Sequence, residues 1–76
     1  MNQEDQEQYF VVCVNNQDYP ASLEVKKIYQ FIPDEQATHH QMIRVIDESN
    51  EDYLYPADYF VVIQLPQSVK QLFFIS

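Results

Sequence analysis

The most constraining feature of this sequence is the order of the β-forming runs in its second half. A run from Met42 to Ile46 and a shorter one from Asp52 to Tyr55 flank the acidic turn Asp47–Glu51. The shorter run ends at Pro56, and after a three-residue corner another β run extends over Tyr59–Gln64. Proline cannot donate to a central ladder, and turn residues separate the runs, so this order predicts a small antiparallel β-barrel.

The first half of the chain adds two further β runs, at Tyr9–Val14 and Ile28–Ile32. The loop between them holds Leu23 and Val25 two residues apart, which places both on one inward face if the segment is extended. The polar stretch Asp34–Gln41 predicts one helical turn with Asp34 as its N-cap. Alternation along the strands gives a predicted core of Leu23, Val25, Ile28, Val45, Leu54 and Val61.

The 76 residues are enough for one domain with a small core. We expect a disordered acidic tail at residues 1–7, the barrel at 8–65 and an apolar C-terminal segment at 66–76. Within the last segment Val69, Leu72 and Phe73 share one face if it is helical. The chain has no glycine, so turns that need a positive φ fall to Asn or Asp residues. The candidates are Asn15, Asn16, Asp18 and Asn50, the last beside Ser49.

Charge and cysteine content narrow the class of protein. The net charge is −8, which disfavours binding to phosphate backbones or to an anionic membrane surface. The single cysteine, Cys13, cannot form an internal disulfide and fits a reducing compartment. Residues 1–8 lack the basic start and apolar stretch of a signal peptide, and no apolar run is long enough to span a bilayer. We therefore expect a cytoplasmic protein.

Residues with catalytic or metal-binding chemistry form no recognisable set. His39 and His40 are adjacent in a loop, whereas zinc sites use four spaced ligands. The acidic turn lacks the central glycine of a calcium loop. Cys13 lies in an apolar run without a nearby base, and Glu24, Asp47 and Glu48 have no recognisable nucleophile beside them. We expect no enzyme, no cofactor and no metal.

Two segments resemble SH3 domains. Leu23–Ile32 resembles the loop that turns through a basic pair, here Lys26-Lys27, into the second SH3 strand. Glu51–Ile63 resembles the SH3 ending, a strand that leads into Pro-x-x-Tyr, a 3₁₀ turn and the last strand. This resemblance covers about residues 22–63 and implies an SH3-like barrel, in which Pro56 and Tyr59 match two positions of the peptide-binding groove. Tyr9 or Tyr19 would stand in for the tyrosine of the first strand, and Met42 and Ile43 for the usual tryptophan of the third.

The whole chain also resembles small uncharacterised bacterial proteins of a type common in cyanobacteria. The shared residues are Ser22-Leu23-Glu24 with Lys27-Ile28-Tyr29, Ile43–Ser49 and Glu51–Pro56. That resemblance implies a bacterial origin and an SH3-like fold, and it leaves the activity open.

The tyrosines are the main candidates for partner binding. Tyr53 and Tyr55 share one face of their strand, and both lie outside if Leu54 points inward. With Tyr59, and with Tyr29 as a further candidate, they would form a partly exposed aromatic patch, of the kind found at protein interfaces. The alternative is that the rings simply cover the barrel. The predicted partner-binding residues are Tyr29, Tyr53, Tyr55, Pro56 and Tyr59.

Together these features predict a non-catalytic protein–protein interaction module that binds through a tyrosine-rich face. One alternative is an accessory subunit docked permanently in a larger complex, and another is an acidic nucleic-acid mimic that blocks a DNA-binding protein. The chain has four large apolar residues in a row near its end, Leu72, Phe73, Phe74 and Ile75, and such residues rarely stay exposed. They would either plug the barrel or, through Phe73, Phe74 and Ile75, join copies into a weak homo-oligomer.

Overall fold

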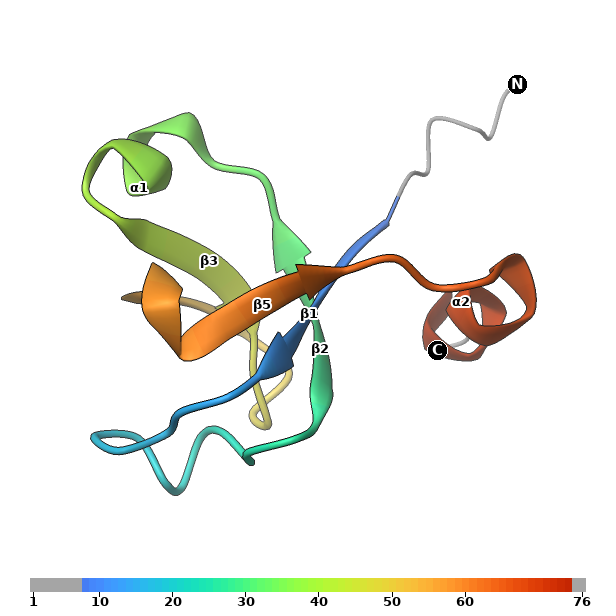
Figure 1. The fold of residues 1–76 in the computed structure, drawn as a ribbon, viewed down its shortest axis with the longest axis horizontal. Coiled ribbons are helices and arrows are strands. Elements are labelled where there is room, and N and C mark those ends of the chain that lie inside the picture. Colours follow the sequence, from blue (N-terminus) through green and yellow to red (C-terminus); the bar gives the residue numbers. More distant parts are fainter. Residues whose placement is uncertain (1–7, 75–76) are drawn as a thin grey trace.

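The computed structural model describes residues 8–74, and the side chains of residues 8–72. Its main element is a single antiparallel sheet of five strands (Figure 1), which confirms the predicted all-β class, strand number and strand direction. The order across the sheet is β4-β3-β2-β1-β5. The strands are β1 (Tyr9–Cys13), β2 (Ile28–Ile32), β3 (Met42–Ile46), β4 (Asp52–Pro56) and β5 (Phe60–Ile63).

The sheet is not closed into a barrel. β4 and β5 stand at its two opposite edges, although only the 3₁₀ turn η2 (Ala57–Tyr59) separates them in sequence. The backbone N–H of Val14 donates to the carbonyl of Tyr59 at 2.8 Å, and that of Ala57 donates to Gln41 at 3.0 Å. These two hydrogen bonds attach the turn η2 to the loop after β1 and to the residue before β3. The predicted five strands are therefore present, while the predicted closure is not observed.

Two short helices flank the sheet. In α1 (Glu35–His39) the side chain of Asp34 accepts the N–H of Ala37 at 3.2 Å, which confirms the predicted N-cap. The helix α2 (Gln67–Phe74) follows Pro66 and lies to one side of the sheet in Figure 1. Leu72 in α2 is 71% exposed, so the predicted apolar face is not fully buried. The tail at residues 1–7 and the contacts predicted for Phe73, Phe74 and Ile75 lie outside the described part of the chain.

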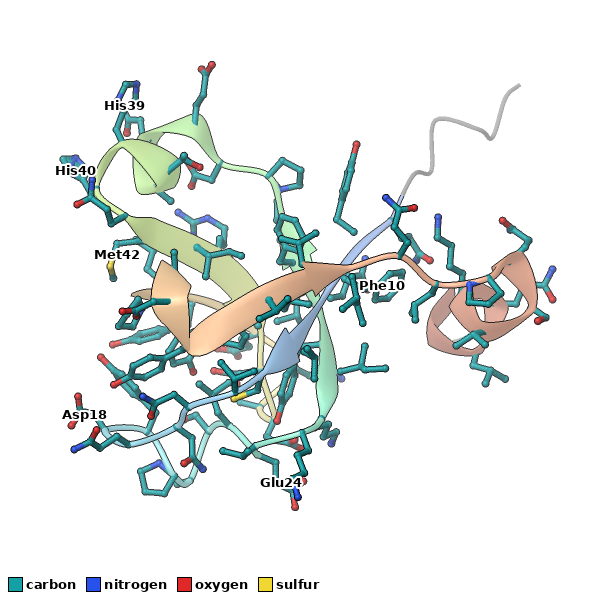
Figure 2. The ribbon with its side chains drawn as sticks, in the orientation of Figure 1. Phe10, Asp18, Glu24, His39, His40 and Met42 are labelled. Atoms are coloured by element: carbon teal, nitrogen blue, oxygen red, sulfur yellow. The ribbon has the colours of Figure 1, made fainter. Side chains whose placement is uncertain are left out.

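The core fills one face of the sheet and contains more aromatic residues than expected. Leu23 and Val45 are buried as predicted. The fully or nearly buried cluster is Val11, Cys13, Leu23, Tyr29, Val45, Tyr55, Tyr59 and Phe60. Phe10, labelled in Figure 2, is also buried although alternation places it on the other face of β1.

Four predicted core residues are less buried than expected. Ile28 and Leu54 are only half-buried, and Val61 is 51% exposed. In β4 and β5 the face that turns inward is shifted by one residue from the predicted face. On the inner side Cys13 lies opposite Phe60, and Ile43 lies opposite Tyr55. Val61 pairs instead with Val12, and Leu54 with Arg44, on the outer side.

Val25 is exposed for a different reason. The next residue, Lys26, has φ 77°, so the loop turns there instead of running extended. Asn50, with φ 72°, confirms one predicted turn residue. Gln41, with φ 56°, is a further left-handed residue, which the sequence did not suggest.

Candidate protein-binding site

The structure divides the predicted site tyrosines between the core and the surface. Tyr29, Tyr55 and Tyr59 are buried, with Tyr55 only 1% exposed, so the expectation that Tyr55 lies outside is wrong. Tyr53 is 56% exposed and Pro56 is half-buried. Tyr29 lies in the same buried cluster as Tyr55 and Tyr59 but comes from β2, whereas Tyr53, Tyr55, Pro56 and Tyr59 come from β4 and the adjoining turn η2.

Strand pairing places Tyr53 and Tyr55 on the inner face of the sheet. Tyr53 and Tyr55 do share one face, as predicted, but it is the face of the buried Val45. Tyr55 lies opposite Ile43 and is buried, whereas Tyr53 lies opposite Val45 and is exposed to solvent. The two tyrosines that were predicted to lie together outside therefore differ in burial: Tyr55 belongs to the core, and Tyr53 lies at the surface.

Tyr19 completes an aromatic cluster that we name the tyrosine surface, formed by Tyr19, Tyr53, Tyr55 and Tyr59. The Tyr19 ring makes edge-on contacts with those of Tyr55 at 4.9 Å, Tyr59 at 6.1 Å and Tyr53 at 6.5 Å between centroids. The rings of Tyr53 and Tyr55 are 5.3 Å apart. Edge-to-face pairs at these distances are favourable, so the exposed ring of Tyr53 rests on fixed neighbours.

Carboxylates anchor the hydroxyls of the buried tyrosines. Tyr55 donates to Asp47 Oδ2 at 2.5 Å, and Tyr59 donates to Asp18 Oδ2 at 2.9 Å. Burial and the bond to Asp47 raise the pKa of Tyr55 to about 12. Burial would raise the pKa of Asp47, but hydrogen bonds from Ser49 and Tyr55 hold it below its usual value. Each buried ring is thus tied to a loop by a charge-assisted bond.

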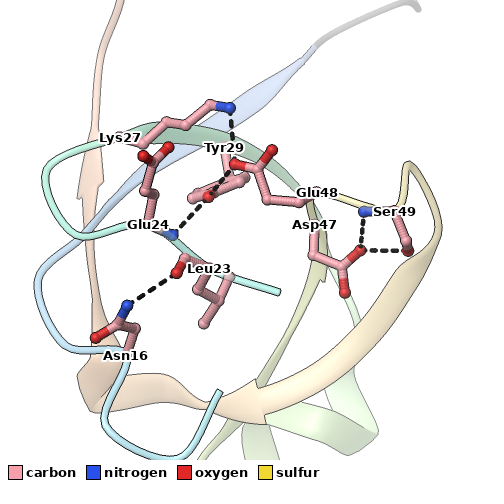
Figure 3. Close-up of polar contacts among 8 residues, drawn as sticks. All are labelled: Asn16, Leu23, Glu24, Lys27, Tyr29, Asp47, Glu48 and Ser49. Atoms are coloured by element: carbon pink, nitrogen blue, oxygen red, sulfur yellow. Dashed lines mark hydrogen bonds and ion pairs between the residues drawn. The ribbon is translucent and has the colours of Figure 1, made fainter. Parts of the chain in front are cut away.

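Tyr29 anchors the loop ends on the other side of the core (Figure 3). Its hydroxyl donates to Glu48 Oε2 at 2.6 Å and accepts the backbone N–H of Glu24 at 2.8 Å. Lys27 Nζ reaches the same Glu48 oxygen at 2.7 Å. The hydrogen bond from Lys27, followed by that from Tyr29, lowers the pKa of Glu48. Tyr29 therefore joins the loop before β2 to the turn after β3.

A groove lies between α1 and the strands β2, β3 and β5. This groove has a volume of about 360 Å³ and is mainly apolar. Its apolar lining includes three residues of the sheet, Phe31, Ile43 and Val62. Asp34 and Arg44 line it with polar groups. Arg44 bonds Asp34 Oδ2 and Asp52 Oδ2, each at 2.9 Å, so its charge is already matched.

The other residues with reactive side chains are dispersed. His39 and His40 are exposed around the end of α1, and Glu24 lies at a loop on the far side of the molecule in Figure 2. Cys13 is fully buried, and burial raises the pKa of its thiol. Among residues 8–74, no three His, Cys, Asp or Glu side chains are grouped so that they could hold a metal ion.

Comparisons with family models, with curated proteins and with solved structures found no match. Within the described residues no helix is long and apolar enough to cross a membrane.

Proposed function

We propose that this chain is a non-catalytic protein-interaction module that binds its partner through the tyrosine surface. As part of this proposal the sheet is an open form of the SH3-like barrel. The strand order, with the 3₁₀ turn between β4 and β5, supports that assignment, and so does the place of Pro56 and Tyr59 in this turn. The buried free thiol of Cys13 is compatible with the bacterial cytoplasm as the site of action.

The observation that carries the proposal is the exposed ring of Tyr53. It is 56% exposed although it rests on Tyr19 and Tyr55, and an aromatic ring held in place loses little entropy on binding. Rigid tyrosines in such positions are enriched among residues that dominate interface energies. Tyr53 therefore provides the centre of the proposed contact, and the half-buried Tyr19 and Pro56 border it.

The charge of the chain indicates the chemistry of the partner. The exposed carboxylate of Asp18 stands beside Tyr59, and Glu51 and Asp52 precede Tyr53 in sequence. With a net charge of −8, complementary potentials favour a basic partner segment. We propose a segment that lays an apolar side chain on Tyr53 and places a Lys or Arg near Asp18.

Affinity purification of the tagged full chain from its host, followed by quantitative mass spectrometry, tests the proposal. Tyr53→Ala should lose the proteins that the wild type retains, because truncation of a central aromatic commonly costs about 2 kcal/mol or more of binding energy. Tyr9→Ala is the matched control, since Tyr9 is also an exposed tyrosine in a strand but contacts Phe31 outside the tyrosine surface.

Both variants must first show melting curves close to that of the wild type. Proteins retained by the wild type and by Tyr9→Ala, but lost with Tyr53→Ala, support the proposal. Equal retention by both variants, or no specific protein retained by the wild type, would overturn it.

A further inference from the structure

The outer edge of β5 is an unpaired strand edge. β5 pairs with β1 on one side, and no strand in the described part of the chain pairs with its other side. Val61 is 51% exposed and Val62 is 63% exposed, on opposite faces of the strand. An edge of this kind offers a row of backbone N–H and C=O groups to another chain.

The two edges of the sheet differ in how they are protected. β4 begins at Asp52, whose carboxylate is held by Arg44, and ends at Pro56, which has no N–H to donate. Charges and prolines are the usual means by which natural proteins block edge pairing. β5 has the sequence Phe-Val-Val-Ile and contains neither. Only the β5 edge is therefore open to strand addition.

The distribution of charge identifies the occupant. All twelve acidic residues lie at or before Asp58, and from Tyr59 onward Lys70 is the only charged side chain. The net charge of −8 is thus concentrated in the part of the sequence before β5. A second copy can bring its own β5, which has no carboxylate, to this edge without placing carboxylates against carboxylates. Of the acidic residues that line the nearby groove, Asp34 is already paired with Arg44.

The groove gives the added strand an apolar surface to cover. Val62 lies opposite the buried Val11 on the inner face, yet it remains exposed because the inner face is open at the groove. Phe31 and Ile43 line the same groove of about 360 Å³. A strand placed along β5 would remove part of this apolar surface from water, which is favourable.

We infer that two copies of this chain associate by antiparallel pairing of β5 with β5 across a two-fold axis that passes near Val61 and Val62. Such a contact is isologous, because each copy offers the same edge to the other. Strands of four residues bury less area than a stable interface normally requires, so the dimer should be weak. Salt should strengthen it, because screening reduces the repulsion between two copies of net charge −8.

Sedimentation velocity of the full chain over a wide concentration range tests this inference. The expected mass rises from 9.1 kDa at low concentration toward twice that value, and the rise begins at lower protein concentration in high salt. A mass of 9.1 kDa at every concentration and salt level would overturn the inference. A dimer that weakens as salt is added would also overturn it, since that response indicates an interface held by ion pairs.

Single lysine substitutions locate the interface. Val62→Lys and Val61→Lys should each shift association to at least tenfold higher concentration, because a charge in the middle of an edge strand blocks pairing. Val25→Lys is the matched control: Val25 is exposed in a loop, and the substitution changes the net charge by the same amount. All three variants should melt near the wild type, because each replaced side chain is more than two-fifths exposed.

Two further variants separate this surface from others. Leu72→Lys alters the exposed side chain of α2, and Tyr53→Ala alters the tyrosine surface; both should dimerise like the wild type. Loss of the dimer in Leu72→Lys but not in Val62→Lys would overturn the β5 assignment in favour of α2. The Tyr53→Ala result also shows that this inference does not depend on the function proposed above.

Discussion

The substitution Tyr55→Phe tests whether carboxylate anchoring of buried tyrosines stabilises the fold. It keeps the ring, which is 1% exposed and packs in the core, and removes only the hydroxyl that donates to Asp47 at 2.5 Å. A hydrogen bond to a charged group contributes about 1.5–3 kcal/mol. Asp47 also accepts the hydroxyl and the backbone N–H of Ser49, so the carboxylate is not left without donors. We therefore expect the lower end, a loss of about 1.5 kcal/mol.

For a domain of this size, 1 kcal/mol corresponds to about 4–8 °C, so Tm should fall by about 6–12 °C. Thermal melts followed by circular dichroism measure this shift. Tyr53→Phe is the matched control, because the Tyr53 ring is exposed and its hydroxyl makes no side-chain hydrogen bond within residues 8–72. The Tm of this variant should stay within about 2 °C of the wild type. Asp47→Asn combined with Tyr55→Phe should cost less than the sum of the two single changes.

A Tyr55→Phe protein with the same Tm as the wild type would refute the reasoning. It would mean that water replaces the Tyr55 hydroxyl at Asp47 without loss. An additive result for the double variant would refute it as well, because two groups that bond each other cannot contribute independently.

Three other predictions concern the stability of the fold. The folded-state pKa of Asp47 lies below its ordinary value of 3.8, so the ionised carboxylate contributes fully to stability above pH 3.8, and this contribution is lost as the pH falls below that value. Urea unfolding at several pH values measures the decline in the free energy of unfolding, which should be smaller in Asp47→Asn. Val45→Asp places an unpaired charge at a fully buried position, which costs several kcal/mol and should abolish the cooperative melt; a melt near that of the wild type would show that Val45 is not buried. Asn50→Ala should lower the free energy of unfolding by about 1 kcal/mol because residue 50 has φ 72°, whereas Asn50→Gly should lower it little. Equal losses for the two variants in chemical unfolding would contradict this.

The sequence predicted the elements of the fold better than their faces. Turn and strand residues located all five strands within one or two residues, and Asp34 marked the start of α1. Those signals are local, so a single sequence contains them. Which face of β4 and β5 turns inward is decided by pairing with distant strands, as when Cys13 lies opposite Phe60. A short strand such as Phe60–Ile63 has apolar residues on both faces, so the alternation of its residues does not show which face turns inward.

The candidate site was predicted in part for the same reason. The predicted set contained Tyr53, Tyr55 and Tyr59, whose spacing around Pro56 is local, and their rings meet around that of Tyr19. Tyr19 was indicated only by the SH3 resemblance, because a residue in a loop has no periodic pattern from which the packing of its ring can be predicted. The groove was not predicted at all. It exists because the sheet stays open beside Val62, a property of the whole sheet that no short motif encodes.

The pairing of tyrosines with carboxylates also bears on the acidity of the chain. Asp18, Asp47 and Glu48 each accept a hydroxyl from a buried tyrosine, so their charges stabilise the fold from within. Asp34 and Asp52 are likewise engaged, through their shared partner Arg44. A nucleic-acid mimic would need its carboxylates free and spaced like phosphates for a basic protein to bind them. At least five of the twelve acids already have internal partners, so part of the acidity of the chain serves the fold, and fewer carboxylates are free in the way that a mimic would need.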